Sequence, residues 1–456
     1  MKISQIKVGA TLTYIYLGLE LIISLIYVPI MLRLLGQSEY GLYNSVVSVV
    51  NYLNLFSFGF GSTYIRYYFR YKVKNEKESI AKLNGMFLVI FSIIGIIASI
   101  AGIFILFNTE AVFGMKYTIQ ELSKAKILVA ILVINITISF PNTVFNSYIT
   151  ANERFIFQKA LQLVKVIIYT VLTLLILLLG YGSIGMAAIT TVLNLSIEIV
   201  NIIFCFKKLS IKFSFRKFDL FLFKEMTVFS FYIFMNMVID QANWNVDKFI
   251  LGRLYGSISV ALYGLASQLN TYYISLSTAI SNVFVSRVNK IVAESDDNHE
   301  LTLLFTKVGR IQFILLSLVI TGMVFFGRPF INMWAGSDYN DSYLIALILM
   351  LPITIPLIQN VGIEIQRAKN MHKFRSWVYF FMSIGNMIIS IPLAKRYEGI
   401  GAATGTALSL IAGNIFIMNW YYDKRVGLDM KHFWKEIISL LPSFLPSILI
   451  GVLINL

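Results

Sequence analysis

Long apolar runs separated by short polar segments dominate the pattern of this 456-residue chain. The runs are rich in Leu, Ile, Gly and Ala and lack the period-two alternation of a membrane barrel, so they predict helices. Because a helix needs roughly 20 apolar residues to cross a bilayer, we predict thirteen membrane spans in an all-α polytopic membrane protein. These spans cover residues 10–32, 40–64, 84–107, 126–149, 155–180, 183–206, 226–251, 258–284, 303–326, 342–366, 375–394, 400–421 and 436–456.

The composition supports the same class. Hydrophobic residues make up 57% of the chain and charged residues only 13%, about half the share found in a soluble domain. That is too little charge to cover the surface of soluble domains. The longest polar segments, near 66–82, 107–124, 206–224 and 286–302, are too short for an extramembrane catalytic domain. We therefore expect the protein to act within the membrane or at its surface.

The distribution of positive charge predicts the orientation in the membrane. With the N-terminus in the cytoplasm, 29 of the 38 Lys and Arg residues fall in cytoplasmic segments and 9 fall outside. This excess follows the positive-inside rule. The rule accounts for most of the net charge of +15, so we expect no nucleic-acid partner. The N-terminus leads into the first span without a small-residue cleavage site, which indicates a retained first helix.

Two halves of the chain resemble each other. Leu34-x-Gly36 with Leu42-Tyr43 recurs as Leu254-x-Gly256 with Leu262-Tyr263, and Ile184-Gly185-x-Ala187-x-x-Thr190 recurs as Ile400-Gly401-x-Ala403-x-x-Thr406. The offsets of 220 and 216 predict two pseudo-symmetric six-helix lobes in the same orientation, an arrangement found in transporters. We place the N-terminal lobe at 1–208, a linker at 209–225, the C-terminal lobe at 226–425 and an additional C-terminal membrane segment at 426–456. The linker is either an amphipathic elbow at the membrane interface or an ordinary basic loop.

Ionisable residues inside apolar spans are the candidates for chemistry, because they usually face protein or a water-filled cavity. They are Glu20, Glu198, Asp240, Asp247 and Lys248. At the repeat offset of 220, Glu20 corresponds to Asp240. Both could bind a coupling cation, carry a proton or form structural ion pairs, whereas Asp247 and Lys248 could instead sit at the outer interface.

A polar stretch in the seventh span adds Asn243 to these candidates. Residues 241–245 read QANWN, which a lipid-facing helix would not tolerate, so this stretch must line protein or water.

The sequence carries no signature of an enzyme or of a metal centre. It has no phosphate-cradling glycine loop, no H-E-x-x-H and no nucleophile elbow. Its single cysteine, Cys205, lies in an apolar stretch where packing is the expected role. The three histidines are scattered over predicted inner loops. We expect a non-enzyme without a cofactor; a coupling cation, Na⁺ or H⁺, stays open.

Several segments together are similar to the polysaccharide flippases, which export capsule and O-antigen repeat units. The resemblance spans about residues 5–425 and is a diffuse pattern rather than one sharp motif. It is carried by YVPIMLRLLGQSEYGLYNSV (27–46), FSFGFGSTYIRYY (56–68), VIDQANWNVDKFILGRLYG (238–256), LYGLASQLNTYY (262–273) and RAKNMHKFRS (367–376). This family belongs to the multidrug/oligosaccharidyl-lipid/polysaccharide exporter superfamily.

The resemblance implies a fold and a substrate. The fold would be two six-helix lobes forming a V around a central cavity. The substrate would be an undecaprenyl-pyrophosphate-linked oligosaccharide, moved by alternating access to the outer leaflet for capsule or exopolysaccharide assembly. Basic cavity residues would attract the pyrophosphate, and the candidates are Arg33, Arg66, Lys248 and Arg253. Arg66 could instead be only the first residue of a basic inner loop.

The family further implies a monomer in the bacterial plasma membrane, with the polysaccharide polymerase machinery as a potential partner. Its members have twelve or fourteen spans, so thirteen means either a chain that ends before a fourteenth span or a last segment that does not cross fully. The alternative function is a cation-coupled multidrug or metabolite exporter of the same fold. A membrane glycosyltransferase or polymerase would need a large outer catalytic loop, which the pattern does not predict.

Overall fold

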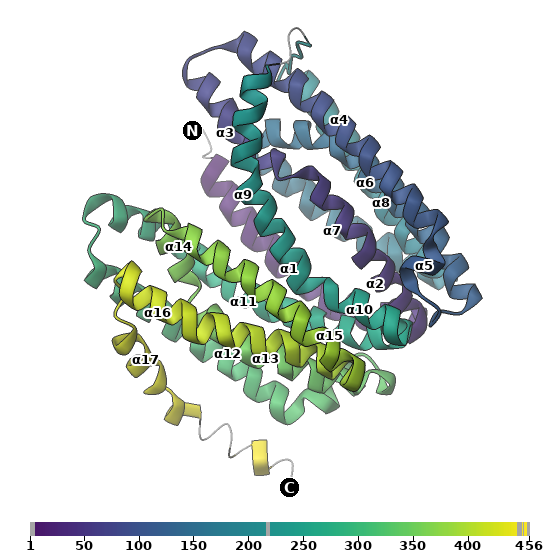
Figure 1. Ribbon diagram of the computed structural model, residues 1–456, viewed down its shortest axis with the longest axis vertical. Helices are drawn as coiled ribbons and strands as arrows, with labels where there is room; N and C mark the ends of the chain where they lie inside the picture. The colour runs from purple at the N-terminus through teal and green to yellow at the C-terminus, as the bar shows by residue number, and fades with distance from the viewer. Residues whose placement is uncertain (1–4, 216–218, 445–448, 450, 454–456) are drawn as a thin grey trace. The chain divides into compact units, whose positions relative to one another are not determined.

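The computed structural model describes residues 5–215, 219–444, 449 and 451–453, and this part of the chain is mostly helical and has no strands. Figure 1 shows long helices joined by short connections. The described chain forms two compact units, Met1–Gln241 (unit 1) and Ala242–Leu456 (unit 2). The lobe boundaries drawn from the sequence repeat stay a prediction, and the division into units falls within a helix.

Unit 1 contains most of the long helices of the first half. Its elements are α1 (Gln5–Leu35), α2 (Gln37–Asn51), the 3₁₀ turn η1 (Tyr52–Ser57), α3 (Phe60–Val73), α4 (Lys77–Phe107), α5 (Thr109–Phe113), α6 (Ile119–Ala151), α7 (Phe155–Leu178), α8 (Gly182–Lys207) and most of α9 (Leu220–Trp244).

Unit 2 begins near the end of α9. Its elements are α10 (Val246–Tyr255), α11 (Ser257–Glu294), α12 (Asn298–Trp334), η2 (Ser337–Tyr339), α13 (Ser342–Ile358), α14 (Asn360–Ala368), α15 (His372–Leu410), η3 (Ile411–Met418), α16 (Asn419–Tyr421), η4 (Tyr422–Val426), α17 (Met430–Ile438) and η5 (Leu441–Phe444). The elements η3 and η4 are π-helical and, with α16 between them, continue the second half of α15, which follows the break at Tyr397 and Glu398.

The first twelve predicted spans all lie on helical segments. Among the described residues, eight helices are long and apolar enough to cross a membrane, or nine when α13 and α14, bent by 42°, count as one span. This number is lower than twelve for local reasons. The span 40–64 is interrupted between α2 and α3, and α11, which holds the predicted span 258–284, is too polar to be included. The predicted spans 375–394 and 400–421 form one continuous stretch in this count, although the non-helical residues Tyr397 and Glu398 separate them. The chain is thus a multi-pass membrane protein.

The last predicted span, 436–456, lies partly outside the described residues. Helix α17, which overlaps its first residues, has 9 residues and is too short to cross a bilayer. Asp429 starts this helix by accepting a hydrogen bond from the backbone N–H of His432 at 2.9 Å.

Helices α4 and α6 approach each other closely because small residues line their contact. Gly95 faces the backbone oxygen of Thr137, and Gly102 faces Val133, so a Cβ at either glycine would collide with α6. Ala98, fully buried, lies between them on the same face of α4. Small residues at such spacing let membrane helices pack backbone to backbone. Helices α4 and α6 are therefore closely packed in unit 1, and α8 packs against α6 as well.

Helix α9 packs on α3 and on the turn that precedes it. The hydroxyls of Thr63 and Ser230 lie 2.6 Å apart, and the rings of Phe58 and Phe234 stack with centroids 4.2 Å apart. These contacts explain why unit 1 extends to Gln241.

The predicted linker 209–225 is described except at 216–218. Its first part runs without regular structure along α4, where the Ser214 N–H donates to the Ala81 oxygen at 2.9 Å and Asn84 donates to the Lys212 oxygen at 2.8 Å. Its last part, from Leu220, is already the first turn and a half of α9.

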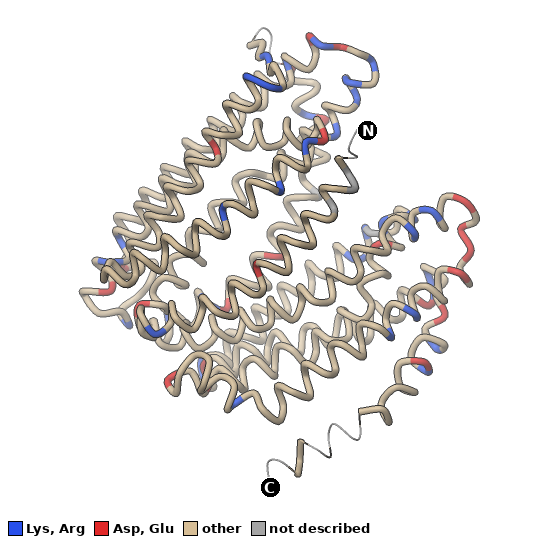
Figure 2. Tube along the Cα trace, turned by 180° about the vertical axis from the view of Figure 1, so that it is seen from behind, with Lys and Arg blue, Asp and Glu red and all other residues tan. Residues whose placement is uncertain are grey.

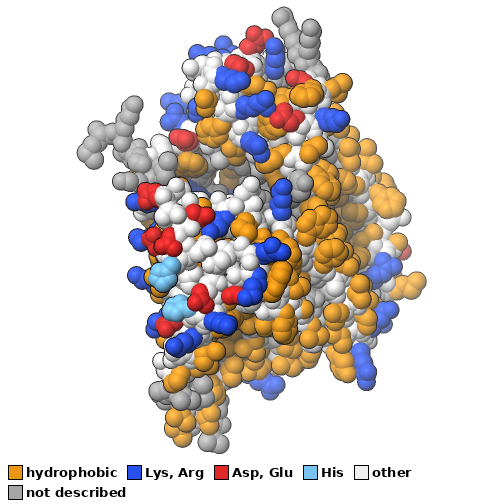
Figure 3. Space-filling view, turned by 60° about the vertical axis from the view of Figure 1, so that its left-hand side comes forward, with side chains coloured by type: hydrophobic (Ala, Val, Ile, Leu, Met, Phe, Trp, Pro, Cys, Tyr) orange, Lys and Arg blue, Asp and Glu red, His pale blue; other side chains and the backbone are white. Residues whose placement is uncertain are grey.

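The surface has the pattern of a membrane protein. Figure 2 shows charged residues mainly at helix ends and in the connections, with few along the middles of the helices. Figure 3 shows wide areas of hydrophobic side chains on the surface. On α4, for example, Ile96, Ile100 and Phe104 recur every four residues and are exposed. Such a stripe is stable only against lipid or protein.

An ionic cluster at Glu39 joins α2, α6 and α8 just outside the predicted span 40–64. The carboxylate accepts hydrogen bonds from Lys124 Nζ at 2.6 Å, from the Ser183 N–H at 2.7 Å and from the Ser183 hydroxyl at 2.8 Å. Gly182, with φ of +57°, leaves room for the carboxylate, which a Cβ would meet. Burial raises the pKa of Glu39, but the hydrogen bonds from Lys124 and Ser183 outweigh it and hold the pKa below its ordinary value.

We predict that Glu39→Gln lowers the free energy of unfolding by about 1–2 kcal/mol at neutral pH, because charge-assisted hydrogen bonds are lost. The pKa of Glu39 is lowered on folding, so this stabilisation is present above the unfolded value and is lost as the pH falls through the folded value. Thermal unfolding in detergent at several pH values measures it, and the difference from wild type should narrow below pH 4.5.

The matched control is Glu110→Gln. The Glu110 carboxylate is exposed and lies 3.8 Å from Lys126, so its replacement should leave stability unchanged. Equal losses for the two variants would contradict the role assigned to Glu39.

Candidate functional site

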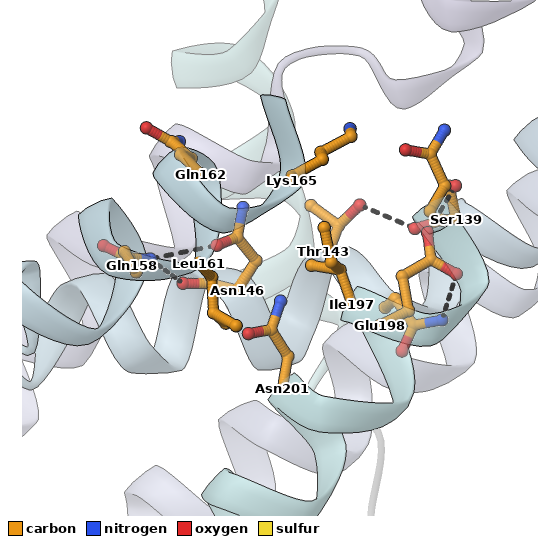
Figure 4. Close-up of a pocket in the computed structure, with 12 residues that line it drawn as sticks. Ser139, Thr143, Asn146, Gln158, Leu161, Gln162, Lys165, Ile197, Glu198 and Asn201 are labelled. Atoms are coloured by element: carbon orange, nitrogen blue, oxygen red, sulfur yellow. Dashed lines mark hydrogen bonds between the residues drawn. The ribbon is translucent and has the colours of Figure 1, made fainter. Parts of the chain in front are cut away.

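A polar cavity lies among α6, α7 and α8 in unit 1 (Figure 4). Its volume is about 380 Å³. Each helix contributes a stripe at spacing i, i+3, i+4, i+7, which puts the four positions on one helix face over about 10 Å. The lining residues are Ser139, Asn142, Thr143 and Asn146 from α6, Gln158, Leu161, Gln162 and Lys165 from α7, and Asn194, Ile197, Glu198 and Asn201 from α8.

Glu198 is held in place by α6. Ser139 Oγ donates to one carboxylate oxygen at 2.5 Å, and Asn142 Nδ2 donates to the other at 3.0 Å. Lys165 attracts Glu198 electrostatically from α7. The predicted candidate Glu198 therefore belongs to a cavity with one acidic and one basic side chain among amides and hydroxyls.

The amides of the cavity are only partly satisfied. Gln158 donates to Asn146 Oδ1 at 2.9 Å and to Thr150 Oγ1 at 2.8 Å. By contrast, the Oδ1 atoms of Asn142 and Asn201 are shielded from solvent and have no hydrogen-bond partner. Buried acceptors are nearly always paired in proteins, so each of these two oxygens carries a desolvation cost that no hydrogen bond within the described residues offsets.

In unit 2, a second polar cluster surrounds Asp247. This carboxylate is 1% exposed, on the first turn of α10. Its Oδ2 accepts hydrogen bonds from Tyr263 of α11 at 2.5 Å and from Thr406 of α15 at 2.9 Å. Its Oδ1 has no hydrogen-bond partner. Asp247 is thus enclosed by unit 2 rather than placed at an interface with water.

More oxygen atoms adjoin Asp247. Thr406 Oγ1 also lies 3.2 Å from Asn386 Oδ1, and Ser390 donates to Asn386 at 2.7 Å and to the Ala402 oxygen at 3.2 Å. Carboxylate, amide, hydroxyl and carbonyl oxygens are the ligands of hard cations. Within the described residues, no group of three or more His, Cys, Asp or Glu side chains is placed to hold a metal ion.

The predicted pyrophosphate residues are divided between the units. In unit 1, Arg33 is exposed in the last turn of α1, and Arg66 is exposed on α3. The Arg66 guanidinium stacks 4.3 Å from the ring centroid of Phe229. In unit 2, Lys248 is half-buried beside Asp247 and Arg253 is exposed in the last turn of α10. The structure does not gather the four into one cluster within a unit.

The remaining candidates lie on α1 and α9. Glu20 is half-buried in the middle of α1, one turn from Tyr16, with which it interacts. Asp240 is exposed near the end of α9, and Asn243 is half-buried four residues before Asp247. None of the three lines the cavity of unit 1.

Sequence reasoning found Glu198 but missed the cavity around it. The signal was present, because three successive spans each carry polar residues at the same helical spacing. Reading ionisable residues alone overlooked the uncharged amides that make up half of the lining.

The sequence matches one family model and two known membrane proteins over most of its length. A family model described as "Polysaccharide biosynthesis protein" matches residues 30–344. The chain is 20% identical over 414 residues to the "Putative O-antigen transporter" of Shigella flexneri, covering 87% of this chain and 92% of the relative. It is also 20% identical over 434 residues to the uncharacterized membrane protein EpsK of Bacillus subtilis strain 168, covering 92% and 84%.

Solved structures share the fold. The lipid II flippase MurJ, in an inward closed conformation, superposes with a TM-score of 0.74 and 19% identity, covering 98% of this chain and 96% of that one. An inward-facing multidrug resistance MATE transporter of the MOP superfamily superposes with a TM-score of 0.67 and 13% identity, covering 86% and 93%. At these identities the likeness shows the fold alone.

We predict that Glu198→Ala lowers the free energy of unfolding by about 1–3 kcal/mol, because Ser139 and Asn142 lose their acceptor. Glu198→Gln keeps an acceptor oxygen and should lose less. Thermal unfolding in detergent ranks the two variants. Equal stability of Glu198→Ala and wild type would show that these hydrogen bonds do not hold α6 to α8.

Proposed function

Because this chain belongs to the polysaccharide biosynthesis protein family, we propose that it is a flippase for undecaprenyl-pyrophosphate-linked oligosaccharides. It moves the repeat unit from the cytoplasmic to the outer leaflet of the bacterial plasma membrane, for capsule or exopolysaccharide assembly. The observation that carries the proposal is the polar cavity of unit 1 inside apolar spans. Polar side chains at this depth are costly, and in membrane proteins they mark the path of a polar substrate.

A flippase must pass a charged and hydroxylated head through the membrane while the tail stays in lipid. The exposed arginines suit the charged part, because guanidinium groups bind phosphate oxygens in a bidentate way. Arg66 is the better placed, since Phe229 holds its guanidinium while leaving it exposed. We assign Arg33, Lys248 and Arg253 to the same task at other points of the path, with the N-terminus cytoplasmic as the charge distribution predicts.

Asp247 is the carboxylate we assign to coupling. Its Oδ1 lacks a partner, and neighbouring hydroxyl and amide oxygens complete a set that suits a cation or a proton. Glu20 and Asp240 are less enclosed, and Glu198 has both oxygens occupied. The exporter alternative draws on one observation, the acidic Glu198 in the cavity, which a cationic substrate would favour.

Deletion of the gene in its host tests the function directly. We expect lipid-linked repeat units to accumulate on the cytoplasmic leaflet, measured by their accessibility to a membrane-impermeant reagent in inside-out vesicles. Restoring the gene should reverse the accumulation. Unchanged lipid pools together with altered sensitivity to cationic drugs would favour the exporter instead.

In the same assay, Arg66→Ala should restore export at a rate at least tenfold below wild type, because the phosphate loses a charge-assisted contact. Protein abundance in the membrane should stay unchanged. The matched control is Arg70→Ala, one turn further along α3, whose exposed partner is Glu225 at 3.1 Å. If both variants export like wild type, Arg66 has no part in substrate binding.

Asp247→Asn tests the coupling role. In proteoliposomes, the variant should transport lipid-linked oligosaccharide at the same rate with and without an imposed Na⁺ or H⁺ gradient, because its side chain carries no charge to exchange. Asp341→Asn is the control, since Asp341 is exposed and caps no backbone N–H through its side chain. A gradient response retained by Asp247→Asn would remove Asp247 from coupling.

A further inference from the structure

We propose that the polar cavity among α6, α7 and α8 is the subsite that reads the sugar part of the transported lipid. The inference rests on the proposed function and names which part of the substrate this cavity takes. The ligand class is a sugar unit bearing hydroxyl or acetamido groups, bound by hydrogen bonds and not by charge.

The side-chain chemistry of the cavity fits a sugar better than a phosphate. Six of its twelve lining residues are Asn or Gln. Each amide offers two N–H donors and a carbonyl acceptor, which match the donor and acceptor character of sugar hydroxyls. Lys165 is the one cation of the lining, and Glu198 balances it. With no net charge, the cavity is unsuited to hold a pyrophosphate.

The amide groups of the cavity suit a ligand that both donates and accepts hydrogen bonds. A pyrophosphate has only acceptor oxygens at neutral pH, so it could use the N–H donors of these amides but not their carbonyl acceptors. Sugar hydroxyls and an acetamido group can use both.

The size and position of the cavity agree with this ligand. Its volume of about 380 Å³ falls within the roughly 300–1,000 Å³ of small-molecule sites. Its outermost amides lie near one common end of the three helices, since Asn146, Gln158 and Asn201 are each within six residues of the end of α6, the start of α7 and the end of α8. The predicted topology makes this the cytoplasmic end. Figure 4 shows Asn201 pointing into the space between Asn146 and Glu198.

Binding to the purified full-length protein in lipid nanodiscs tests the proposal with two probes. One is undecaprenyl pyrophosphate without sugar, and the other is the lipid-linked oligosaccharide extracted from the host. We expect Asn201→Leu to weaken binding of the oligosaccharide-bearing lipid about tenfold and to leave binding of undecaprenyl pyrophosphate unchanged.

A second variant, at an exposed position, tests the subsite even if Asn201→Leu does not fold. Gln162 is exposed at the cavity, and its side-chain oxygen accepts a hydrogen bond from Lys159 at 3.0 Å. Gln162→Leu should therefore fold normally and weaken the same lipid selectively, by a few fold. The matched control is Asn44→Leu, because the Asn44 amide lies on α2 of unit 1 and donates to the carbonyl of its own helix at 3.0 Å. This control should bind both probes like wild type.

The outcomes separate the two proposals. If wild-type protein binds neither lipid, the proposed function fails and the subsite falls with it. If wild type binds both lipids, but Asn201→Leu and Gln162→Leu bind the oligosaccharide-bearing lipid as wild type does, the subsite alone is wrong. Equal weakening of both probes would likewise overturn it, because the cavity would then not distinguish sugar from pyrophosphate.

Discussion

The cost of a polar side chain inside a bilayer is the constraint on which the rest of this structure depends. An ionisable group near the membrane centre costs about 2.5–3.5 kcal/mol on insertion scales. The protein meets this cost by enclosing its carboxylates within helix packing, as at Glu198 between α6 and α8 and at Asp247 between α10, α11 and α15. Carboxylates that are enclosed in this way are therefore the places where function is expected.

The packing of α6 shows how a rigid support and a polar cavity are built on one helix. Pro141 has no N–H to donate to the Thr137 oxygen, so that oxygen is left to face Gly95 of α4. The same stretch carries Ser139 and Asn142, which turn toward α8. Close contact with α4 fixes the position of α6. The α6 side chains that line the cavity are therefore held in place as well.

The sequence was sufficient for the spans, because their signal is local and long. The connection predicted between spans 375–394 and 400–421 is confirmed by the break at Tyr397 and Glu398. The interruption between α2 and α3 and the bend after Ile358 were not predicted, because they depend on tertiary packing. For the site, hydrophobic context singled out Glu198 and Asp247. Their surroundings stayed hidden, because Tyr263 and Thr406 are 16 and 159 residues from Asp247 along the chain. The Asn and Gln residues on α6, α7 and α8 are visible in the sequence at helical spacing. A search for ionisable residues did not select them, because amides carry no charge.

The two repeats use one scaffold for different chemistry. At the offset of 220, Asp247 and Tyr263 of unit 2 correspond to Tyr27 and Tyr43 of unit 1, which interact with each other. Thr406 corresponds to Thr190, whose hydroxyl donates to a carbonyl of its own helix rather than to a carboxylate. Unit 1 thus has a tyrosine where unit 2 has a buried acid, and it places its polar cavity elsewhere, on α6, α7 and α8. This divergence is what a transporter needs if one half is to sense the driving ion and the other the cargo.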